Sequence, residues 1–334
     1  MHLDLTVFAV FNLFVLAMLA LDLGVFHRQA HVVSTREALV WSGVWFVLAM
    51  LFNLLIWQQP GWFFGPAQVE AAIASGDLAA GSGLAQLGVL RSEEFLAGYL
   101  IEKALSTDNV FAIAAIFTML SVPAVYQHKV LFYGIVGALV LRAIFIFAGV
   151  ALIQQFAWII VVFGVFLLWT GIQMALPHKP VEVREHWFLR LCRRYLPVTD
   201  GYREDRFLVR EGGRLMATPL LLVVLMVEFT DVVFAVESIP AILAITDDIF
   251  IVYTSNVFAI LGLRSLFFAL AGMTKAFAYL KYALAGILVF VGVKMLLHLW
   301  AIKVPIELSL GIIGGMLAAG IVVSLLRVRP GSSP

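Results

Sequence analysis

Long apolar runs separated by polar loops dominate this chain. Nine segments each hold about 20 mostly apolar residues, the length that a helix needs to cross the hydrocarbon core of a membrane. They cover residues 5–26, 38–57, 95–120, 130–153, 156–176, 216–245, 250–272, 282–299 and 306–326. The pattern predicts an all-α polytopic membrane protein with about nine transmembrane helices.

Composition supports the same class. Hydrophobic residues make up 63% of the 334 residues and charged residues only 13%, whereas soluble domains are roughly half apolar and about a quarter charged. The formal net charge is +1, which indicates no nucleic acid or other polyanionic partner. The single cysteine, Cys192, cannot form an internal disulfide or a thiolate metal site. No P-loop or intramembrane protease motif is present, so we expect a protein that is not an enzyme.

Basic residues mark one side of the membrane. They gather in the loops after the first, third, fifth, seventh and ninth segments, and most of all in the loop 177–215. Because cytoplasmic loops carry an excess of Lys and Arg, this distribution predicts an outside N-terminus and a cytoplasmic C-terminus. The N-terminus lacks a positively charged leader and a cleavage site, so we expect the first segment to be retained as a helix.

Two loops are long. We expect residues 58–94, rich in Gly, Pro, Ser and Ala, to form an irregular external excursion. In the loop 177–215, residues 186–195 predict a short basic helix, which is either solvated or held at anionic headgroups. Residues 207–210 and 214–217 flank Glu211-Gly212-Gly213 and predict a small β-hairpin.

A repeated hexapeptide is the most informative pattern. Residues 107–112 read Thr-Asp-Asn-Val-Phe-Ala and residues 230–235 read Thr-Asp-Val-Val-Phe-Ala, so five of six positions match at an offset of 123. Arg142 and Arg264 follow in the next segments at an offset of 122, each with a Phe-rich run behind it. The third and sixth segments cross the membrane in opposite directions, and the two copies are therefore inverted.

The repeat predicts a transporter architecture. Repeat one covers about residues 95–176 (helices 3–5) and repeat two about 216–299 (helices 6–8), within one transmembrane domain spanning 1–334. Inverted repeats place a substrate site near the membrane midplane, where one half rocks against the other.

Acidic residues lie inside these segments, where each charged acid costs at least about 2.5 kcal/mol. They are Asp22, Glu102, Asp108, Glu228, Asp231 and Glu237. Glu228 and Asp231 are three residues apart and share a helix face. Asp231 and Glu237 are six residues apart, about 240° around a helix, and cannot converge on a continuous one. Pro240 removes a backbone donor in one acidic helix. In the other, Ser106, Thr107 and Asn109 compete for backbone groups beside Asp108, so we expect both helices to be interrupted near the acids.

The donor atoms indicate the ligand. Glu102, Asp108, Glu228, Asp231 and Glu237 offer carboxylate oxygens and Asn109 an amide oxygen, and an all-oxygen set suits Mg²⁺, Ca²⁺ or Mn²⁺. The acids also carry protons, so cation–proton exchange is a natural extension. We place Asp22, Arg142 and Arg264 on the proton or ion pathway. Alternatively, the two arginines pair with some of the acids as structural ion pairs.

The acidic motifs and their surroundings resemble the TerC family, which includes the bacterial Alx proteins. Residues 102–111 read Glu-Lys-Ala-Leu-Ser-Thr-Asp-Asn-Val-Phe, and residues 228–240 read Glu-Phe-Thr-Asp-Val-Val-Phe-Ala-Val-Glu-Ser-Ile-Pro. The lead-in at 207–219, Phe-Leu-Val-Arg-Glu-Gly-Gly-Arg-Leu-Met-Ala-Thr-Pro, is also similar to that family. The last acid, Glu237, is often aspartate in the family, which bears on coordination distances.

The resemblance implies manganese export from a bacterial plasma membrane, and a link to tellurite or alkaline-pH phenotypes. On this basis we expect Mn²⁺ as cargo, with Ca²⁺ or another hard divalent cation as the alternative, and no tightly bound cofactor. A scaffold for a stress-response complex that uses the basic loop is a second reading, and an oxyanion transporter is a third, which clustered acids disfavour. A homo-oligomer or other membrane partner is left open.

Overall fold

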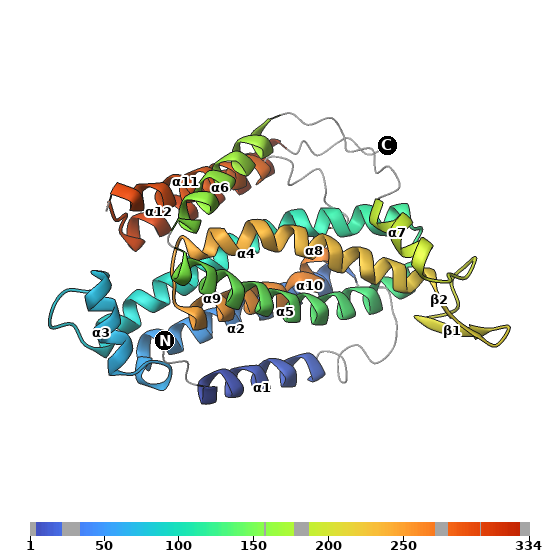
Figure 1. Ribbon diagram of the computed structural model, residues 1–334, viewed down its shortest axis with the longest axis horizontal. Helices are drawn as coiled ribbons and strands as arrows, with labels where there is room; N and C mark the ends of the chain where they lie inside the picture. Colours follow the sequence, from blue (N-terminus) through green and yellow to red (C-terminus); the bar gives the residue numbers. More distant parts are fainter. Residues whose placement is uncertain are drawn as a thin grey trace.

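The computed structural model describes residues 5–21, 34–156, 158–176, 187–270, 280–300 and 302–327. Almost all of these are helical (Figure 1). The helices are α1 (Leu5–Leu21), α2 (Thr35–Gln58), α3 (Pro66–Ser75), α4 (Leu84–Met119), α5 (Ala124–Gln155), α6 (Ile159–Ala175), α7 (Trp187–Tyr195), α8 (Pro219–Leu243), α9 (Ile249–Leu261), α10 (Leu263–Leu270), α11 (Leu280–Leu297) and α12 (Ile306–Arg327). Short 3-10 turns occupy Pro60–Trp62 (η2) and His298–Trp300 (η4).

The predicted class is confirmed: the chain is an all-α polytopic membrane protein. Each predicted apolar segment coincides with a helix, and the segment 250–272 contains a pair, α9 and α10, bent by 40°. Within the described residues, five helices are long and apolar enough to span a membrane alone, or six if the bent pair is one span. The count of nine stays a prediction, as does the inverted repeat.

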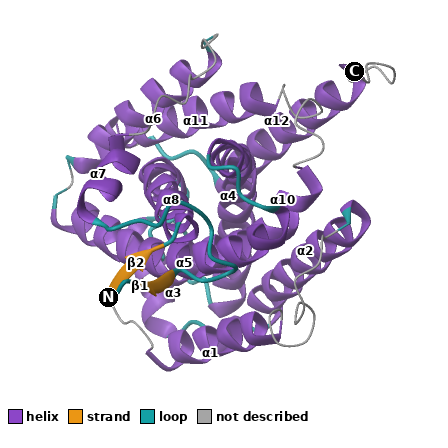
Figure 2. Cartoon of the chain, turned by 90° about the vertical axis from the view of Figure 1, so that its right-hand side faces the viewer, coloured by secondary structure: helices purple, strands orange, loops and turns teal. Residues whose placement is uncertain are grey.

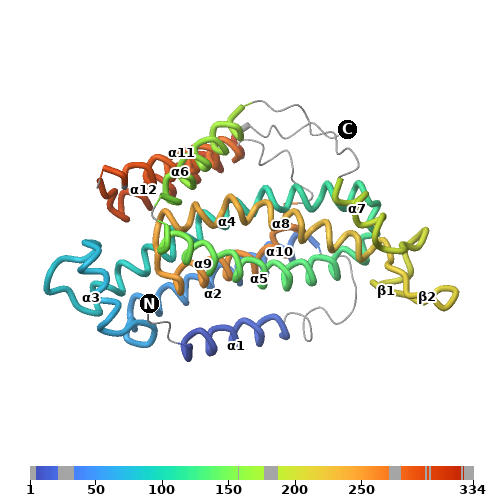
Figure 3. Tube along the Cα trace, viewed as in Figure 1, coloured from blue at the N-terminus to red at the C-terminus, as the bar shows by residue number. Residues whose placement is uncertain are grey.

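Helices α4 and α8 lie in the middle of the bundle. Figure 2 shows them nearly end-on, with α6, α11 and α12 along one side and α1 and α2 on the other. Helix α4 packs on both α8 and α9, and α8 packs on both α4 and α5. The trace in Figure 3 shows α4 and α8 running side by side, although they are distant in the sequence. Residues near the middle of these two helices are therefore enclosed by protein.

Helices α6 and α11 form the closest pair in the layer that flanks α4 and α8. Glycines let their backbones approach: a Cβ atom at Gly171 would lie 2.8 Å from the carbonyl oxygen of Ala285, and one at Gly292 would lie 2.9 Å from that of Gly164. Small residues serve this purpose in membrane helices, because lipid supplies no hydrophobic drive for helix association.

The connections between the long helices correct one expectation and confirm two. The stretch 58–94 is not irregular throughout, because it contains η2, α3 and the first turns of α4, which begins at Leu84. Gln86 fixes that start by accepting a hydrogen bond from the backbone N–H of Gly83 at 2.9 Å. The predicted short helix is confirmed as α7. The predicted hairpin is confirmed as β1 (Leu208–Glu211) antiparallel to β2 (Arg214–Ala217).

Gly292→Ala tests the α6–α11 contact. The added methyl group meets backbone atoms of α6 that cannot rotate away, so we expect the free energy of unfolding to fall by about 1–3 kcal/mol, as in other overpacked interiors. Thermal unfolding of the purified protein in detergent measures the change. Gly315→Ala on α12 is the matched control, since a Cβ atom there meets nothing within 4 Å. Equal melting temperatures for both variants would contradict the close contact.

Candidate functional site

The acidic helices run unbroken through their acids. Helix α4 is continuous from Leu84 to Met119 and α8 from Pro219 to Leu243, so the predicted interruption is wrong for both. Pro240 lies in the last turn of α8, where only one hydrogen bond is lost. Ser106 donates to the carbonyl oxygen of Glu102 at 2.7 Å and Thr230 to that of Met226 at 2.8 Å, so these hydroxyl groups bond within the helix.

Arg142 of α5 holds two of the acids. Its guanidinium group donates to both carboxylate oxygens of Asp231, from Nη2 at 2.8 Å and Nε at 3.1 Å, and its Nη1 donates to Glu102. Asn256 of α9 completes the network, because its Nδ2 donates to Glu102 Oε2 at 3.1 Å. Arg142 is only 2% exposed and Glu102 is fully buried. The arginine thus joins α4, α5, α8 and α9 through charge-assisted hydrogen bonds.

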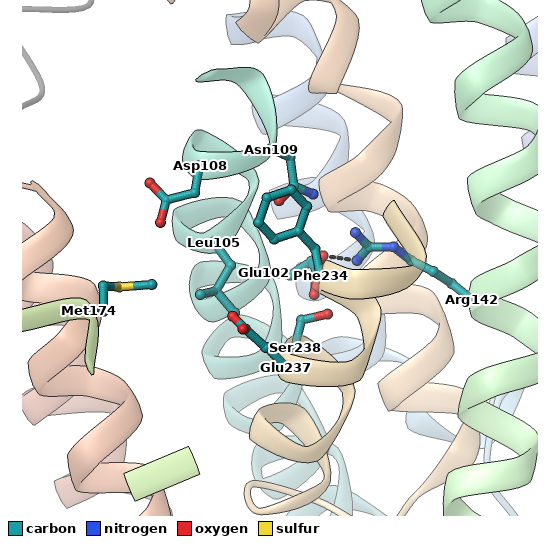
Figure 4. A pocket seen from close by; sticks show the side chains of 9 residues that line it. All are labelled: Glu102, Leu105, Asp108, Asn109, Arg142, Met174, Phe234, Glu237 and Ser238. Carbon is teal, nitrogen blue, oxygen red and sulfur yellow. Dashed lines mark hydrogen bonds and ion pairs between the residues drawn. The ribbon is translucent and has the colours of Figure 1, made fainter. Parts of the chain in front are cut away.

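Asn109 lies beside this network. With its amide oxygen turned toward Arg142, it accepts a hydrogen bond from Nη2 at 3.3 Å and donates to the carbonyl oxygen of Leu105 at 3.2 Å. Asn109 is one helical residue beyond Asp108, so the two side chains point to different sides of α4 (Figure 4).

Asp108 and Glu237 point away from the arginine, toward α6. They line a cavity of about 10 Å³ together with Leu105, Met174, Phe234 and Ser238, and Glu102 and Arg142 reach it from the far side (Figure 4). Neither carboxylate forms a salt bridge within the described part of the chain, although the charge of Lys281 on α11 acts on Asp108 from farther away. The space suffices for one water-sized particle.

Ser238 leaves a polar atom unused at this cavity. The residue is only 1% exposed, and its Oγ has no hydrogen-bond partner among the described residues. An unsatisfied buried hydroxyl group costs free energy unless a ligand or a water molecule pairs with it. The cavity therefore combines two carboxylates with an unpaired hydroxyl group.

Glu228 lies apart from this cavity. It shares a face of α8 with Asp231, as its spacing predicts, but packs against α5 at Gly137, where a Cβ atom would overlap its carboxyl group. Both carboxylate oxygens are buried without a hydrogen-bond partner in the described chain. Such a carboxyl group is suited to carry a proton rather than a fixed charge.

A second cavity of about 20 Å³ adjoins the first. Asn109 and Phe234 line both cavities, and Thr230 and Asp231 line the second. Asn109 and Phe234 are thus the two side chains that both spaces share.

The other predicted site residues are placed as follows. Asp22 lies outside the described residues. Arg264 is buried on α10 and lines neither cavity. In the described residues, no three His, Cys, Asp or Glu side chains come close enough to share one metal ion. The acids are instead divided between the arginine network, the cavity and the packed position of Glu228.

A buried network near the start of α4 was missed. Arg91 donates to Glu94 at 2.6 Å and to Thr246 at 3.2 Å, and Thr246 donates to Glu94 at 2.7 Å. Arg91 also lines a cavity of about 240 Å³ with Asp247 and Asp248. Both Arg91 and Glu94 fall in the stretch 58–94, for which the sequence predicts an irregular loop. The capping pair Gly83 and Gln86 is the signal that places both on α4.

The fold and this site define a class: a polytopic helical membrane protein with carboxylates and an arginine enclosed near the middle of its bundle. The chain belongs to the TerC family, because the family model described as "Integral membrane protein TerC family" matches residues 90–331. No solved structure shows a significant match.

Relatives with assigned names cover nearly the whole chain. The "Uncharacterized membrane protein STKORF319" of Myxococcus xanthus is 50% identical over 320 residues, which is 96% of this chain and 92% of the relative. The "Putative membrane-bound redox modulator Alx" of Escherichia coli (strain K12) is 45% identical over 316 residues, covering 94% and 92% of the two chains. An "Uncharacterized membrane protein" of Rickettsia bellii is 37% identical over 319 residues, covering 95% and 96%.

Arg142→Gln tests the network. It leaves Glu102 and Asp231 buried without their cation, and removing one partner of a buried ion pair costs about 3–5 kcal/mol. We expect a large fall in melting temperature in detergent. The additional changes Glu102→Gln and Asp231→Asn remove the unpaired charges and should restore part of the loss. Arg210→Gln on the exposed face of β1 is the control, and an equal melting temperature for Arg142→Gln and Arg210→Gln would refute the network's structural role.

Proposed function

We propose that this protein exports divalent metal cations, Mn²⁺ foremost, through the space between α4 and α8. One observation carries the proposal: Asp108 and Glu237, from the two central helices, meet the unpaired hydroxyl group of Ser238 at a cavity the size of one water molecule. A bare divalent cation matches this space and these oxygen donors.

The charges around the cavity favour a cation. Glu102, Asp108 and Glu237 line it and Asp231 lies directly behind, whereas Arg142 is the one cationic side chain in contact with them among the described residues. If all four acids are ionised, their negative charge exceeds the positive charge of the arginine by three. A divalent cation and one proton would balance this excess. The same imbalance repels an oxyanion.

Arg142 has a defined part in this mechanism. In the absence of a metal ion its guanidinium group compensates Glu102 and Asp231, which would otherwise be buried and unpaired. Entry of a cation beside Asp108 and Glu237 shifts the balance of charge, and Glu102 and Asp231 can then be shared between the metal ion and the arginine. Glu228, buried without a partner, is the candidate proton carrier.

The helix contacts are compatible with alternating access. Helix α4 packs on α9, α5 packs on α8, and α6 packs on α11. In the two predicted repeats α4 corresponds to α8, α5 to α9 and α6 to α11. Exchanging the repeats therefore turns the first contact into the second and leaves the third unchanged. Movement of one repeat against the other would open the two adjoining cavities in turn. We propose that Asn109 and Phe234, which line both, separate them.

The metal and the setting follow from the family and the charge pattern. The TerC resemblance implies manganese, and Ca²⁺ is the alternative that the oxygen donors also fit. We propose a bacterial plasma membrane, with the N-terminus outside and the basic segment 177–215 in the cytoplasm. Export then runs from the side of α7 and the hairpin toward the side of α3 (Figure 1).

Metal flux into proteoliposomes tests the proposal. We expect wild-type protein to accumulate Mn²⁺ in response to a pH gradient, and Asp108→Asn and Asp231→Asn each to lower the initial rate by about tenfold or more, because supporting groups alone alter metal affinity by 10–100-fold.

The matched control is Glu307→Gln, which removes an exposed acid at the start of α12. It should retain the wild-type rate. Wild-type rates for both aspartate variants, at equal reconstitution, would overturn the assignment of the site, and absence of flux in the wild type would overturn the function.

An exposed basic face on α7 supports a second candidate, a membrane partner in a metal, tellurite or alkaline stress-response complex. Arg190, Arg193 and Arg194 are all exposed on this helix. Deleting the segment is a poor test, because Phe188 of α7 stacks on Phe229 of α8 with ring centroids 4.4 Å apart, next to Glu228.

The triple change of Arg190, Arg193 and Arg194 to Gln keeps that contact and removes the basic face. We expect it to preserve metal tolerance in cells that lack the native protein. Loss of tolerance in cells together with normal flux in proteoliposomes would favour the partner function instead.

A further inference from the structure

One side chain at the central cavity offers a sulfur atom as a donor. Met174, close to the end of α6, lines the same space as Asp108, Glu237 and Ser238. Figure 4 shows it reaching from α6 toward α4, on the side to which Asp108 points. It is the contribution of α6 to the cavity among the described residues, and all of the other lining residues come from α4, α5 and α8.

The simplest role for a methionine at this position is to fill space between packed helices. Met174 is half-buried and contacts the apolar cluster formed by α4, α8 and α11, and methionine often fills irregular gaps in cores. Here, however, the thioether borders a space that stays open, and two carboxylates without salt bridges and the unpaired Ser238 hydroxyl group border it too. A gap-filling side chain would close such a space.

The size of the cavity makes its donor atoms decisive. About 10 Å³ admits one water-sized particle, so a cation must shed most of its water to enter and must take its ligands from the protein. Mg²⁺ sheds water reluctantly and usually keeps several water ligands. Ca²⁺ takes six to eight ligands that are all oxygen, whereas this cavity offers two carboxylates, one hydroxyl group and the thioether of Met174.

Sulfur discriminates among the remaining cations. A thioether is a soft, polarisable donor that favours the softer d-block ions and adds almost nothing for Mg²⁺ or Ca²⁺. Mn²⁺, which also suits oxygen ligands, gains the least among the d-block ions. Affinity for a given mixed site rises from Mn²⁺ through Fe²⁺ to Co²⁺. A thioether beside two carboxylates therefore favours divalent transition metals over the alkaline-earth ions.

We propose that Met174 is a specificity-determining ligand, whose sulfur atom joins Asp108, Glu237 and Ser238 and restricts the cargo to divalent transition-metal cations. The inference rests on the proposed export function and names the substrate class of that same site. Because Met174 belongs to the flanking layer of α6 and α11, its place at the cavity also ties metal selectivity to the position of that layer against α4 and α8.

Met174→Leu tests the inference, because leucine has a similar volume and no sulfur. Flux into proteoliposomes is measured for Mn²⁺, Co²⁺ and Ca²⁺, and Cd²⁺ serves as a soft competitor of Mn²⁺ uptake. We expect Cd²⁺ inhibition to weaken by about tenfold, Co²⁺ flux to fall by a smaller factor and Mn²⁺ flux to fall least. Ca²⁺ flux should stay equal or rise. Met295→Leu, at a buried methionine of α11 that does not line the cavity, should match the wild type.

A graded loss that follows metal softness supports a sulfur ligand. An equal loss for all cations would mean that Met174 only packs. Fluxes and Cd²⁺ inhibition equal to those of the wild type would mean that it does not meet the cargo. Either outcome overturns the inference and leaves cation export intact. Absence of flux in the wild type would overturn the proposed function. In that case, calorimetric titration of the detergent-purified protein with Cd²⁺ tests whether Met174 contributes to metal binding. Binding that is equal in wild type and Met174→Leu, or no binding at all, overturns the inference as well.

Discussion

The fold depends on the ion pairs that Arg142 makes inside the bundle. Its guanidinium group joins Glu102 on α4 to Asp231 on α8, with Asn256 on α9 completing the contacts. Buried charges of one sign would push these helices apart or demand protons. With the arginine in place, the two central helices pack closely while acids remain between them. That compensation is what allows further carboxylates to face a cavity nearby.

Helix periodicity then divides the acids between two roles. Asp231 and Glu237 are six residues apart on an unbroken helix, so one faces Arg142 and the other faces α6. Glu102 and Asp108 on α4 have the same spacing and the same division. Glu102 and Asp231 thus hold the helices together through Arg142, although each also reaches a cavity, whereas Asp108 and Glu237 face the first cavity without a salt bridge in the described part of the chain. Within each of the two motifs, therefore, one acid is bound by Arg142 and the other has no salt bridge in the described part of the chain.

The sequence predicted the class, the apolar segments, the short helix α7 and the hairpin, because apolar run length and turn residues are local signals. The cost of acids in apolar segments also singled out Asp108 and Glu237, which the structure places at the central cavity. It did not predict the division of the acids. The spacing of Asp231 and Glu237 correctly predicts that the two side chains do not converge on a continuous helix. The predicted break in the helix is wrong, because Asp231 binds Arg142 on one side of α8 and Glu237 faces the cavity on the other. The place of Met174 depends on the packing of α6 against α4 and α8, which no local pattern encodes. The early start of α4 was missed because the Gly-, Pro- and Ser-rich composition of residues 58–94 favours a loop and outweighed the capping pair Gly83 and Gln86.

The central claim is that Asp108 and Glu237 bind a divalent cation between α4 and α8. Electron paramagnetic resonance of Mn²⁺ tests it most directly, since the sharp six-line signal of the free ion is lost on binding. Titration of the purified wild-type protein should remove the signal of about one Mn²⁺ per chain, and the double variant Asp108→Asn/Glu237→Gln should leave the signal of free Mn²⁺. Equal Mn²⁺ binding by the two proteins, or no binding by the wild type, would contradict the account.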